Sequence, residues 1–139
     1  MKLAVVALLL GVAAPLFADV SAPAPGAIRW RTDVGAAERE AAKGKRPLLL
    51  FFSAKWCTPC QEMLARSFAD PAVAELVARR FVPLVVDLTD DDAPARAVAD
   101  RFGVRAMPTL LVVRGSDERL RQESFLPAAE LRAALDRVR

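Results

Sequence analysis

The chain has 139 residues, of which 54% are hydrophobic, so it can fill the core of one domain. Lys and Arg residues number 20 and Asp and Glu residues 17, a formal net charge of +3, and the two signs are interspersed along the chain. This pattern indicates a solvated surface rather than a basic patch, and it argues against nucleic-acid binding.

Residues 1–18 have the pattern of a secretory signal peptide. One charged residue, Lys2, precedes a run of leucine, valine and alanine, and Ala18 is a small residue at a plausible signal-peptidase site. The apolar run is short for a membrane span, so cleavage is favoured over the alternative of an uncleaved N-terminal anchor. Residues 19–26 are rich in proline and alanine and predict a linker, followed by one domain at 27–139 in the periplasm or another exported location.

The first half of the domain predicts two strands and two helices. Residues 28–32 alternate in polarity, as in a short edge strand, and Asp33 caps a helix that ends near Gly44. The apolar run at residues 48–52 predicts a buried strand. A helical pattern then extends from residue 58 to about residue 67.

The second half continues the alternation of helices and strands. We expect a helix capped by Asp70 with Pro71 at its first position, a strand at 81–88, a helix capped by Asp92 and ended by Gly103, strands at 109–113 and about 119–125, and a terminal helix opened by Pro127. Strands that alternate with helices, closed by a hairpin, predict an α/β fold with a mixed sheet.

The chain has only two cysteines, Cys57 and Cys60, and both lie where the buried strand at 48–52 gives way to a helix. Residues three apart share a helix face, so the two thiols can close a disulfide. Cys57 lies at the helix N-terminus, where unpaired N–H groups and the helix dipole favour a thiolate. Such a pair is typical of thiol–disulfide exchange.

A purely structural disulfide is the weaker interpretation, because so short a loop removes little entropy from the unfolded chain. A metal site needs more ligands than two sulfurs, and the chain has no histidine. We therefore expect neither a metal nor an organic cofactor.

Two motifs resemble the thioredoxin superfamily, and the resemblance extends from about residue 28 to the C-terminus. They are Trp-Cys-Thr-Pro-Cys at residues 56–60, after a buried strand, and Met107-Pro108-Thr109, before a later strand. Residues 68–87 are most similar to the C-terminal domain of DsbD-type thiol:disulfide interchange reductases. The resemblance implies a thioredoxin fold, with a central mixed sheet flanked by helices and an N-terminal β-α extension.

The resemblance also implies roles for the matched residues. Cys57 would be the attacking nucleophile, with an exposed sulfur, and the more buried Cys60 would resolve the mixed disulfide. Pro108 would follow a cis peptide bond, and Met107 would offer backbone groups to an extended substrate. The residues expected to bind substrate are Trp56, Thr58, Pro59, Met107 and Pro108.

Three positions depart from the family pattern. Phe51 stands where thioredoxins have a buried acid, Pro83 where a lysine often neighbours that acid, and Leu64 where DsbD-type domains have a second acid. The nearest charged residues in sequence, Lys55 and Glu62, are expected on the solvated surface. We therefore expect either that solvent takes the proton of Cys60 or that exchange is slow.

These observations predict an exported, monomeric thiol–disulfide oxidoreductase that reduces protein disulfides and is recharged by a membrane thiol donor. The dipeptide between the cysteines lacks the histidine of strong oxidants, so a reductase or an isomerase is expected rather than a primary oxidant. Two alternatives remain open. One is a peptide-binding module without redox turnover, and the other is a dedicated thiol reductase in cytochrome c assembly.

Overall fold

The structure, a computed structural model, describes residues 27–139, and the predicted leader (1–18) and linker (19–26) lie outside them. The helices are α1 (Val34–Gly44), α2 (Thr58–Glu62), η1 (Met63–Ser67), α3 (Pro71–Arg80), α4 (Ala93–Arg101) and α5 (Ala128–Asp136). The strands are β1 (Leu48–Ser53), β2 (Val82–Asp87), β3 (Thr109–Arg114) and β4 (Asp117–Gln122).

The four strands form one mixed sheet in the order β2-β1-β3-β4. β1 pairs in parallel with β2 and antiparallel with β3, and β3 forms a hairpin with β4. Every residue of β1 is buried, as expected for a central strand covered on both faces. The prediction of an α/β fold with a central mixed sheet is confirmed.

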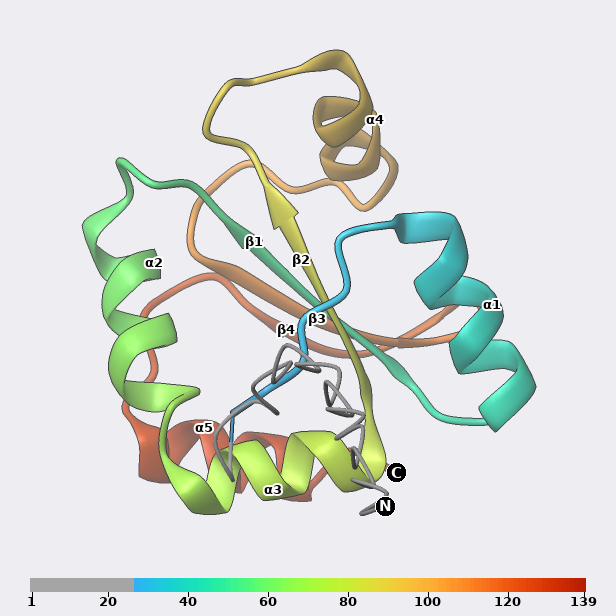
Figure 1. Cartoon of the computed structure of the whole chain (residues 1–139), viewed down its shortest axis with the longest axis vertical. Helices are drawn as coiled ribbons and strands as arrows, with labels where there is room; N and C mark the ends of the chain where they lie inside the picture. The colour runs from blue at the N-terminus through green and yellow to red at the C-terminus, as the bar shows by residue number, and fades with distance from the viewer. Residues whose placement is uncertain (1–26) are drawn as a thin grey trace, which may run out of the picture.

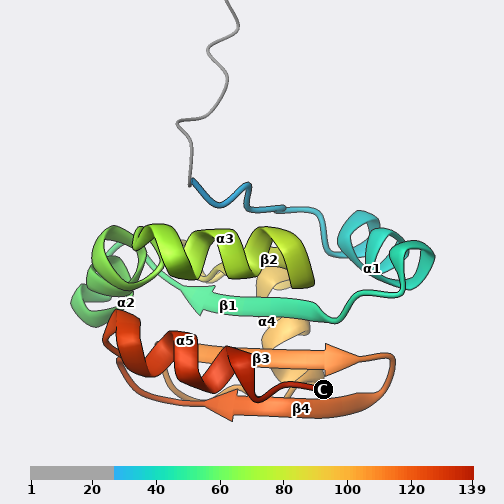
Figure 2. The same ribbon diagram turned by 90° about the horizontal axis from the view of Figure 1, so that it is seen from below.

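Helices cover both faces of the sheet, and Figure 2 shows α3 and α5 in front of β1 and β3 with α4 behind them. Successive side chains of a strand point to opposite faces. Leu49 and Phe51 accordingly contribute to one core, which we call the α2–α3–α5 core, and Leu48, Leu50 and Phe52 to the other, the α1–α4 core. Figure 1 shows β1 running through the middle of the molecule, with α2 at its C-terminal end.

Three aspartates begin helices as predicted. The Oδ1 atom of Asp33 accepts a hydrogen bond from the Ala36 amide at 2.6 Å, and the corresponding atoms of Asp70 and Asp92 accept from amides in the first turns of α3 and α4. Each carboxylate satisfies an amide that has no partner within its helix. Gly103 ends α4 with a φ of +64°, which a glycine adopts at little cost.

The predicted edge strand at 28–32 is wrong as a regular strand, because only Arg31 forms a bridge, to Leu84 in β2. The Arg31 amide donates to the Pro83 carbonyl, and the Val85 amide donates to the Arg31 carbonyl, both at 2.9 Å. The next bond of a parallel ladder would come from the amide of residue 83 to the Arg29 carbonyl. Proline has no such N–H, and the Arg29 carbonyl instead accepts from the Arg31 guanidinium at 2.6 Å.

Two other boundaries differ from the prediction. The helix expected over 58–67 changes to a π-helix at Met63, where the Phe68 amide donates to the Met63 carbonyl at 2.8 Å. The last strand begins and ends earlier than expected, because Gly115, with a φ of +61°, allows a tight turn that pairs Asp117 with Arg114. Within residues 27–139 no helix is long and apolar enough to cross a membrane.

Candidate active site

Cys57 and Cys60 form a disulfide with an S–S distance of 2.08 Å and a Cα–Cα distance of 5.3 Å. β1 ends at Ser53, and a short loop brings Cys57 to the position that precedes α2. The Cys57 amide donates to the Ala54 carbonyl at 3.1 Å, and the Gln61 amide donates to the Cys57 carbonyl at 3.1 Å. These bonds fix Cys57 to the end of the strand and to the first turn of the helix, so the two sulfurs meet within one turn.

The two cysteines differ in exposure, although both are largely buried. Cys57 keeps 6% of its accessible surface and Cys60 keeps 0%. Cys57 is therefore the more accessible of the two in this disulfide form, and the exposure of its sulfur in the reduced form stays a prediction. Both residues pack in the α2–α3–α5 core.

Cys57 lines a groove of about 890 Å³. One wall is the loop that carries the cysteines, and the other consists of the end of β2, α4 and the segment before β3. The groove is lined by Trp56, Cys57, Thr58, Pro59, Leu88, Thr89, Asp91, Arg96, Ala99, Asp100, Val104, Arg105, Ala106 and Met107. Four of the five residues expected to bind substrate are thus brought together from two segments some fifty residues apart.

Trp56 and the Met107–Pro108 pair differ in how they lie at this groove. Trp56 is 64% exposed, so it offers a large apolar surface to a partner. The Met107–Pro108 peptide bond is cis, with Met107 half-buried at the groove and Pro108 buried beneath it. Pro108 is therefore the one expected binding residue that does not line the groove itself.

The cysteine loop is supported by Thr89, which follows β2. Its hydroxyl accepts a hydrogen bond from the Lys55 amide at 2.8 Å, and its carbonyl accepts one from the Trp56 indole at 3.2 Å. The Thr89 hydroxyl donates to Oδ1 of Asp87, and the Thr89 amide donates to the same oxygen at 2.9 Å. Asp87 and Thr89 together hold the backbone before Cys57 and the ring of Trp56.

The Thr89 hydroxyl lowers the pKa of Asp87 below its usual value, and the Thr89 amide and the positive charge of Lys55 act in the same direction against the effect of burial. Neither Asp87 nor Thr89 was predicted from the sequence as part of the site. The spacing of Asp87 and Thr89 was the available signal, because an aspartate often accepts hydrogen bonds from the residue two positions on.

Phe51, at the position of the family's buried acid, lies in an aromatic cluster. Its ring centroid is 5.0 Å from that of Phe68 and 6.1 Å from that of Trp30. Leu64 packs against the same core, and Lys55 and Glu62 are exposed. Among residues 27–139 the buried polar side chains are all hydroxyls, those of Ser53, Ser67 and Thr109, so no carboxylate is buried near Cys60.

Residues 34–139 match the family of thioredoxin-like domains. The chain belongs to this family. The thiol:disulfide interchange protein DsbD of Ralstonia nicotianae is 33% identical to this thioredoxin-like chain over 109 residues, which cover 77% of the chain and 18% of the DsbD protein. The chain spans less than a fifth of the length of this and the other DsbD relatives that it matches.

Two solved structures are similar to this thioredoxin-like domain. A thioredoxin from Thermus thermophilus has a TM-score of 0.71 and 28% identity, with 81% of this chain and 87% of that chain covered. The reduced C-terminal domain of DsbD from Neisseria meningitidis has a TM-score of 0.66 and 25% identity, with 76% and 92% covered. The predicted superfamily and the predicted thioredoxin fold are confirmed.

Proposed function

We propose that this domain is an exported thiol–disulfide oxidoreductase that reduces disulfides in protein substrates. The observation that carries the proposal is the Cys57–Cys60 disulfide, which joins the only two cysteines of the chain at the wall of a groove. Membership of the thioredoxin-like family and similarity to proteins named thiol:disulfide interchange protein DsbD support the same reaction class.

The reaction begins with the reduced pair. The Cys57 thiolate attacks one sulfur of a substrate disulfide, forms a mixed disulfide and releases the other substrate sulfur as a thiolate. The Cys60 thiolate then attacks the Sγ atom of Cys57, which releases the second substrate thiolate and leaves the Cys57–Cys60 disulfide. Two electrons pass from the cysteine pair to the substrate, and the released thiolates take up protons from solvent.

The position of Cys57 favours its role as the nucleophile. It directly precedes α2, whose first amides lack partners within the helix and stabilise a thiolate. It is also the cysteine that lines the groove, whereas Cys60 has no accessible surface. A substrate sulfur can therefore approach Cys57 and cannot approach Cys60.

The groove would bind the substrate as an extended chain. Trp56, Thr58 and Pro59 form one side and Met107 the other, next to the buried Pro108. Charged side chains along the groove are already paired, Arg96 with Asp91 and Arg105 with Asp100. Binding through backbone groups and apolar contacts suits such a groove, because it does not require a particular substrate charge.

The proton of Cys60 is the step in which this domain differs from its family. No buried carboxylate is available among the described residues, and Phe51 occupies the corresponding position within an aromatic cluster. We propose that solvent takes this proton when the mixed disulfide opens the site. The resolving step is then slower than in a thioredoxin, and its rate rises with pH as the Cys60 thiol ionises.

The remaining parts of the proposal follow from the resemblance. A membrane thiol donor would reduce the Cys57–Cys60 disulfide again, and residues 1–18 would direct export to the periplasm before cleavage or, in the alternative, anchor the domain. The proposal requires neither a metal nor an organic cofactor and treats the domain as a monomer.

The reduction potential of the Cys57–Cys60 pair tests the proposed direction. We would equilibrate the protein against a series of glutathione ratios and measure the oxidised fraction by alkylation and mass. A potential near that of thioredoxin, roughly −270 mV, supports a reductase. A potential near that of the strong oxidants, roughly −120 mV, contradicts this direction.

Trapping of mixed disulfides tests the order of attack. Cys60→Ser should accumulate a mixed disulfide with a protein substrate, because the resolving thiol is missing, whereas Cys57→Ser should not. The doubly substituted protein serves as the control and should reduce no disulfide. If it retains full function in cells, the peptide-binding alternative is correct and the redox proposal is wrong.

A further inference from the structure

A second pocket lies at the opposite end of β1 from the disulfide. It has a volume of about 540 Å³ and lies between α1, the end of α4, the start of β1 and the end of β3. Leu48, the first residue of β1, lines it, whereas the last residue of the strand leads into the cysteine loop. This pocket has no residue in common with the groove at Cys57.

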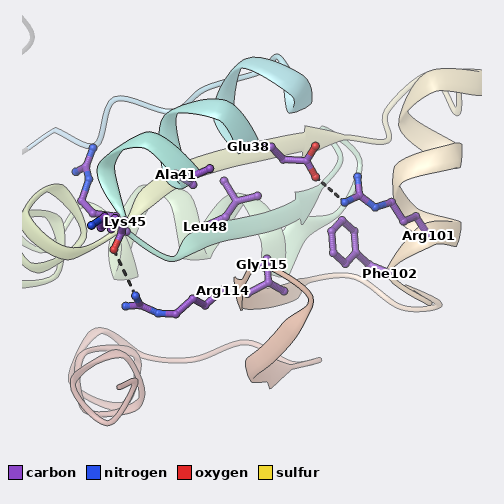
Figure 3. Close-up of a pocket in the computed structure, with 11 residues that line it drawn as sticks. Glu38, Ala41, Lys45, Leu48, Arg101, Phe102, Arg114 and Gly115 are labelled. Atoms are coloured by element: carbon purple, nitrogen blue, oxygen red, sulfur yellow. Dashed lines mark hydrogen bonds and ion pairs between the residues drawn. The ribbon is translucent and has the colours of Figure 1, made fainter.

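The floor of this pocket is apolar. Ala41, Leu48 and Val113 are buried members of the α1–α4 core, and the ring of Phe102 is half-buried beside them. Figure 3 shows Ala41, Leu48 and Phe102 directed toward one hollow from three different elements. An apolar floor of this kind gains stability when a ligand covers it, because the contact removes apolar surface from water.

The rim of the pocket carries a surplus of positive charge. Its charged side chains are Lys45, Arg46, Arg101, Arg114 and Glu38. Arg101 pairs with Glu38 at 2.7 Å and lies over the Phe102 ring at 4.9 Å, and Arg46 pairs with Glu40 at 3.1 Å. Within the described part of the chain, neither Lys45 nor Arg114 has a carboxylate partner.

The Arg114 guanidinium lies next to the backbone of Lys45. A guanidinium nitrogen of Arg114, Nη1, donates to the Lys45 carbonyl at 3.3 Å, a bond drawn in Figure 3. The bond uses one of the five N–H groups of the guanidinium and leaves the others available. An anion at this side of the pocket would meet the Arg114 guanidinium, and Lys45 supplies a second cation to the lining of the same pocket.

The backbone of Lys45 is in the left-handed conformation directly after α1. Lys45 has a φ of 52° and a ψ of 33°, the left-handed conformation, and its amide and that of Arg46 bond to carbonyls of the last turn of α1. Glycine is the usual residue at this position after a helix. Here the glycine stands one residue earlier, at Gly44, and the chain keeps a lysine where glycine has the lower conformational cost.

We propose that this pocket binds a small amphipathic carboxylate. The apolar body of the ligand packs on Ala41, Leu48 and Phe102, and its carboxylate is bound by Lys45 and Arg114. The volume lies within the range of small-molecule sites, which are concave and mostly apolar with few polar groups. A carboxylate matches the planar guanidinium of Arg114 and compensates the surplus charge at the rim.

Titration of the full-length chain with decanoate tests the proposal, with decan-1-ol as the neutral ligand of the same chain length. Calorimetry gives the affinity, and amide NMR shifts locate the site. We expect shifts at Lys45, Phe102 and Gly115 and none at Trp56. Decan-1-ol should bind roughly tenfold more weakly, because it lacks the charge-assisted hydrogen bonds of the carboxylate.

Matched variants separate the pocket cations from general charge. Arg114→Gln and Lys45→Gly should each weaken decanoate binding by roughly tenfold. Lys45→Gly should at the same time raise the melting temperature, because glycine relieves the left-handed backbone, so weaker binding cannot result from unfolding. Lys43→Gln removes a lysine from the same helix turn that does not line the pocket, and it should leave the affinity unchanged.

Four results would overturn the proposal. The first two are equal affinities for decanoate and decan-1-ol, and a loss of decanoate affinity in Lys43→Gln as large as that in Lys45→Gly. The third is a set of amide NMR shifts confined to the groove at Trp56. The fourth is binding of the protein to phosphatidylglycerol vesicles but not to free decanoate. None of these measurements requires the cysteines to be redox-active, so the test does not depend on the proposed oxidoreductase function.

Discussion

The two faces of β1 are both made of apolar side chains, but they pack against different neighbours. On one face Phe51 joins an aromatic cluster with Trp30 and Phe68 in the core that also holds both cysteines. On the other face the ring centroids of Phe52 and Phe102 lie 6.4 Å apart, in a core that contains neither cysteine. Two faces of one fully apolar strand thus contribute to different parts of the molecule: one packs with the cysteines, and the other supplies Leu48 to the pocket at Lys45. Only the neighbours of the strand in space distinguish its two faces.

The largest change in stability is expected from Phe51→Asp, and Phe52→Asp is the matching substitution on the other face of β1. Each change buries a carboxylate in an apolar core and should lower the free energy of unfolding by about 3–5 kcal/mol at neutral pH. Only Phe51→Asp restores an acid at the family's position. If it folds, it should shorten the lifetime of the mixed disulfide, measured by quenched alkylation, and Phe52→Asp should not.

The pH dependence of these two variants follows from the same burial. Burial raises the pKa of the new carboxyl above its unfolded value of about 3.9, so the folded state retains a proton that the unfolded state releases. The destabilisation should therefore be smallest in acid, where only the loss of the ring and the burial of a neutral carboxyl remain, and grow as the pH rises toward the raised pKa. Denaturant unfolding at several pH values measures this, and a loss of stability that is the same at all pH values would contradict it. Phe51→Asn is the matched control, because its buried amide does not ionise and its destabilisation should not change with pH in this way.

An intermediate effect is expected at Thr89, which holds the cysteine loop from the end of β2. Thr89→Val keeps the shape but removes the acceptor for the Lys55 amide and the donor to Asp87, so it should lower stability by about 1–2 kcal/mol and raise the KM for a protein disulfide. Thr89→Ser keeps the hydroxyl and should behave like the natural chain. Equal KM values for the valine and serine variants would show that the hydroxyl does not position the site.

Asp87 accepts hydrogen bonds from Thr89, and its contribution to the free energy of unfolding should depend on pH. Its pKa is lower in the folded chain than the unfolded value of 3.8, so its stabilising effect is fully present above that value and is lost as the pH falls through the lowered pKa. The stability difference between the natural chain and Asp87→Asn should accordingly be largest near neutral pH and vanish in strong acid. A constant difference in urea unfolding across this range would contradict the assignment.

The smallest effect is expected from the buried serine Ser53, and the buried serine Ser67 serves as its comparison. Ser53 is 3% exposed, and its hydroxyl has no hydrogen-bond partner among residues 27–139, whereas the Ser67 hydroxyl donates to the Leu126 carbonyl. Ser53→Ala should leave stability unchanged or raise it by about 0.5–1 kcal/mol, because it removes an unsatisfied polar group. Ser67→Ala should lower it by about 1–2 kcal/mol, since the buried carbonyl loses its partner. Thermal unfolding compares the two, and a larger loss for Ser53→Ala would reverse the interpretation.

Much of the fold could be predicted because its signals are local. Asp33, Asp70 and Asp92 each cap a helix through atoms two or three residues away, and the two cysteines lie one helical turn apart. A pattern that acts over so few residues is visible in the sequence itself.

The missed features depend on contacts between distant segments. Thr89 bonds to Lys55 and Trp56 across more than thirty residues, and Arg31 pairs with a strand more than fifty residues away, where Pro83 lacks the amide that would extend the bridge. The pocket at Lys45 likewise arises from residues of four different elements. No local pattern specifies which of these partners meet, so the sequence could not reveal them.

The pairing of Arg31 with β2 also bears on how the sheet avoids association with other sheets. At the outer edge of β2, Pro83 has no amide N–H to donate, and the Pro83 carbonyl and the Val85 amide are already bonded to Arg31. Few backbone hydrogen-bonding groups therefore remain at this edge for another strand. At the opposite edge, β4 has the sequence Asp-Glu-Arg-Leu-Arg-Gln, whose charges oppose the docking of an apolar strand. Both edges of the sheet are thus protected against aggregation, one by its backbone and the other by its side chains.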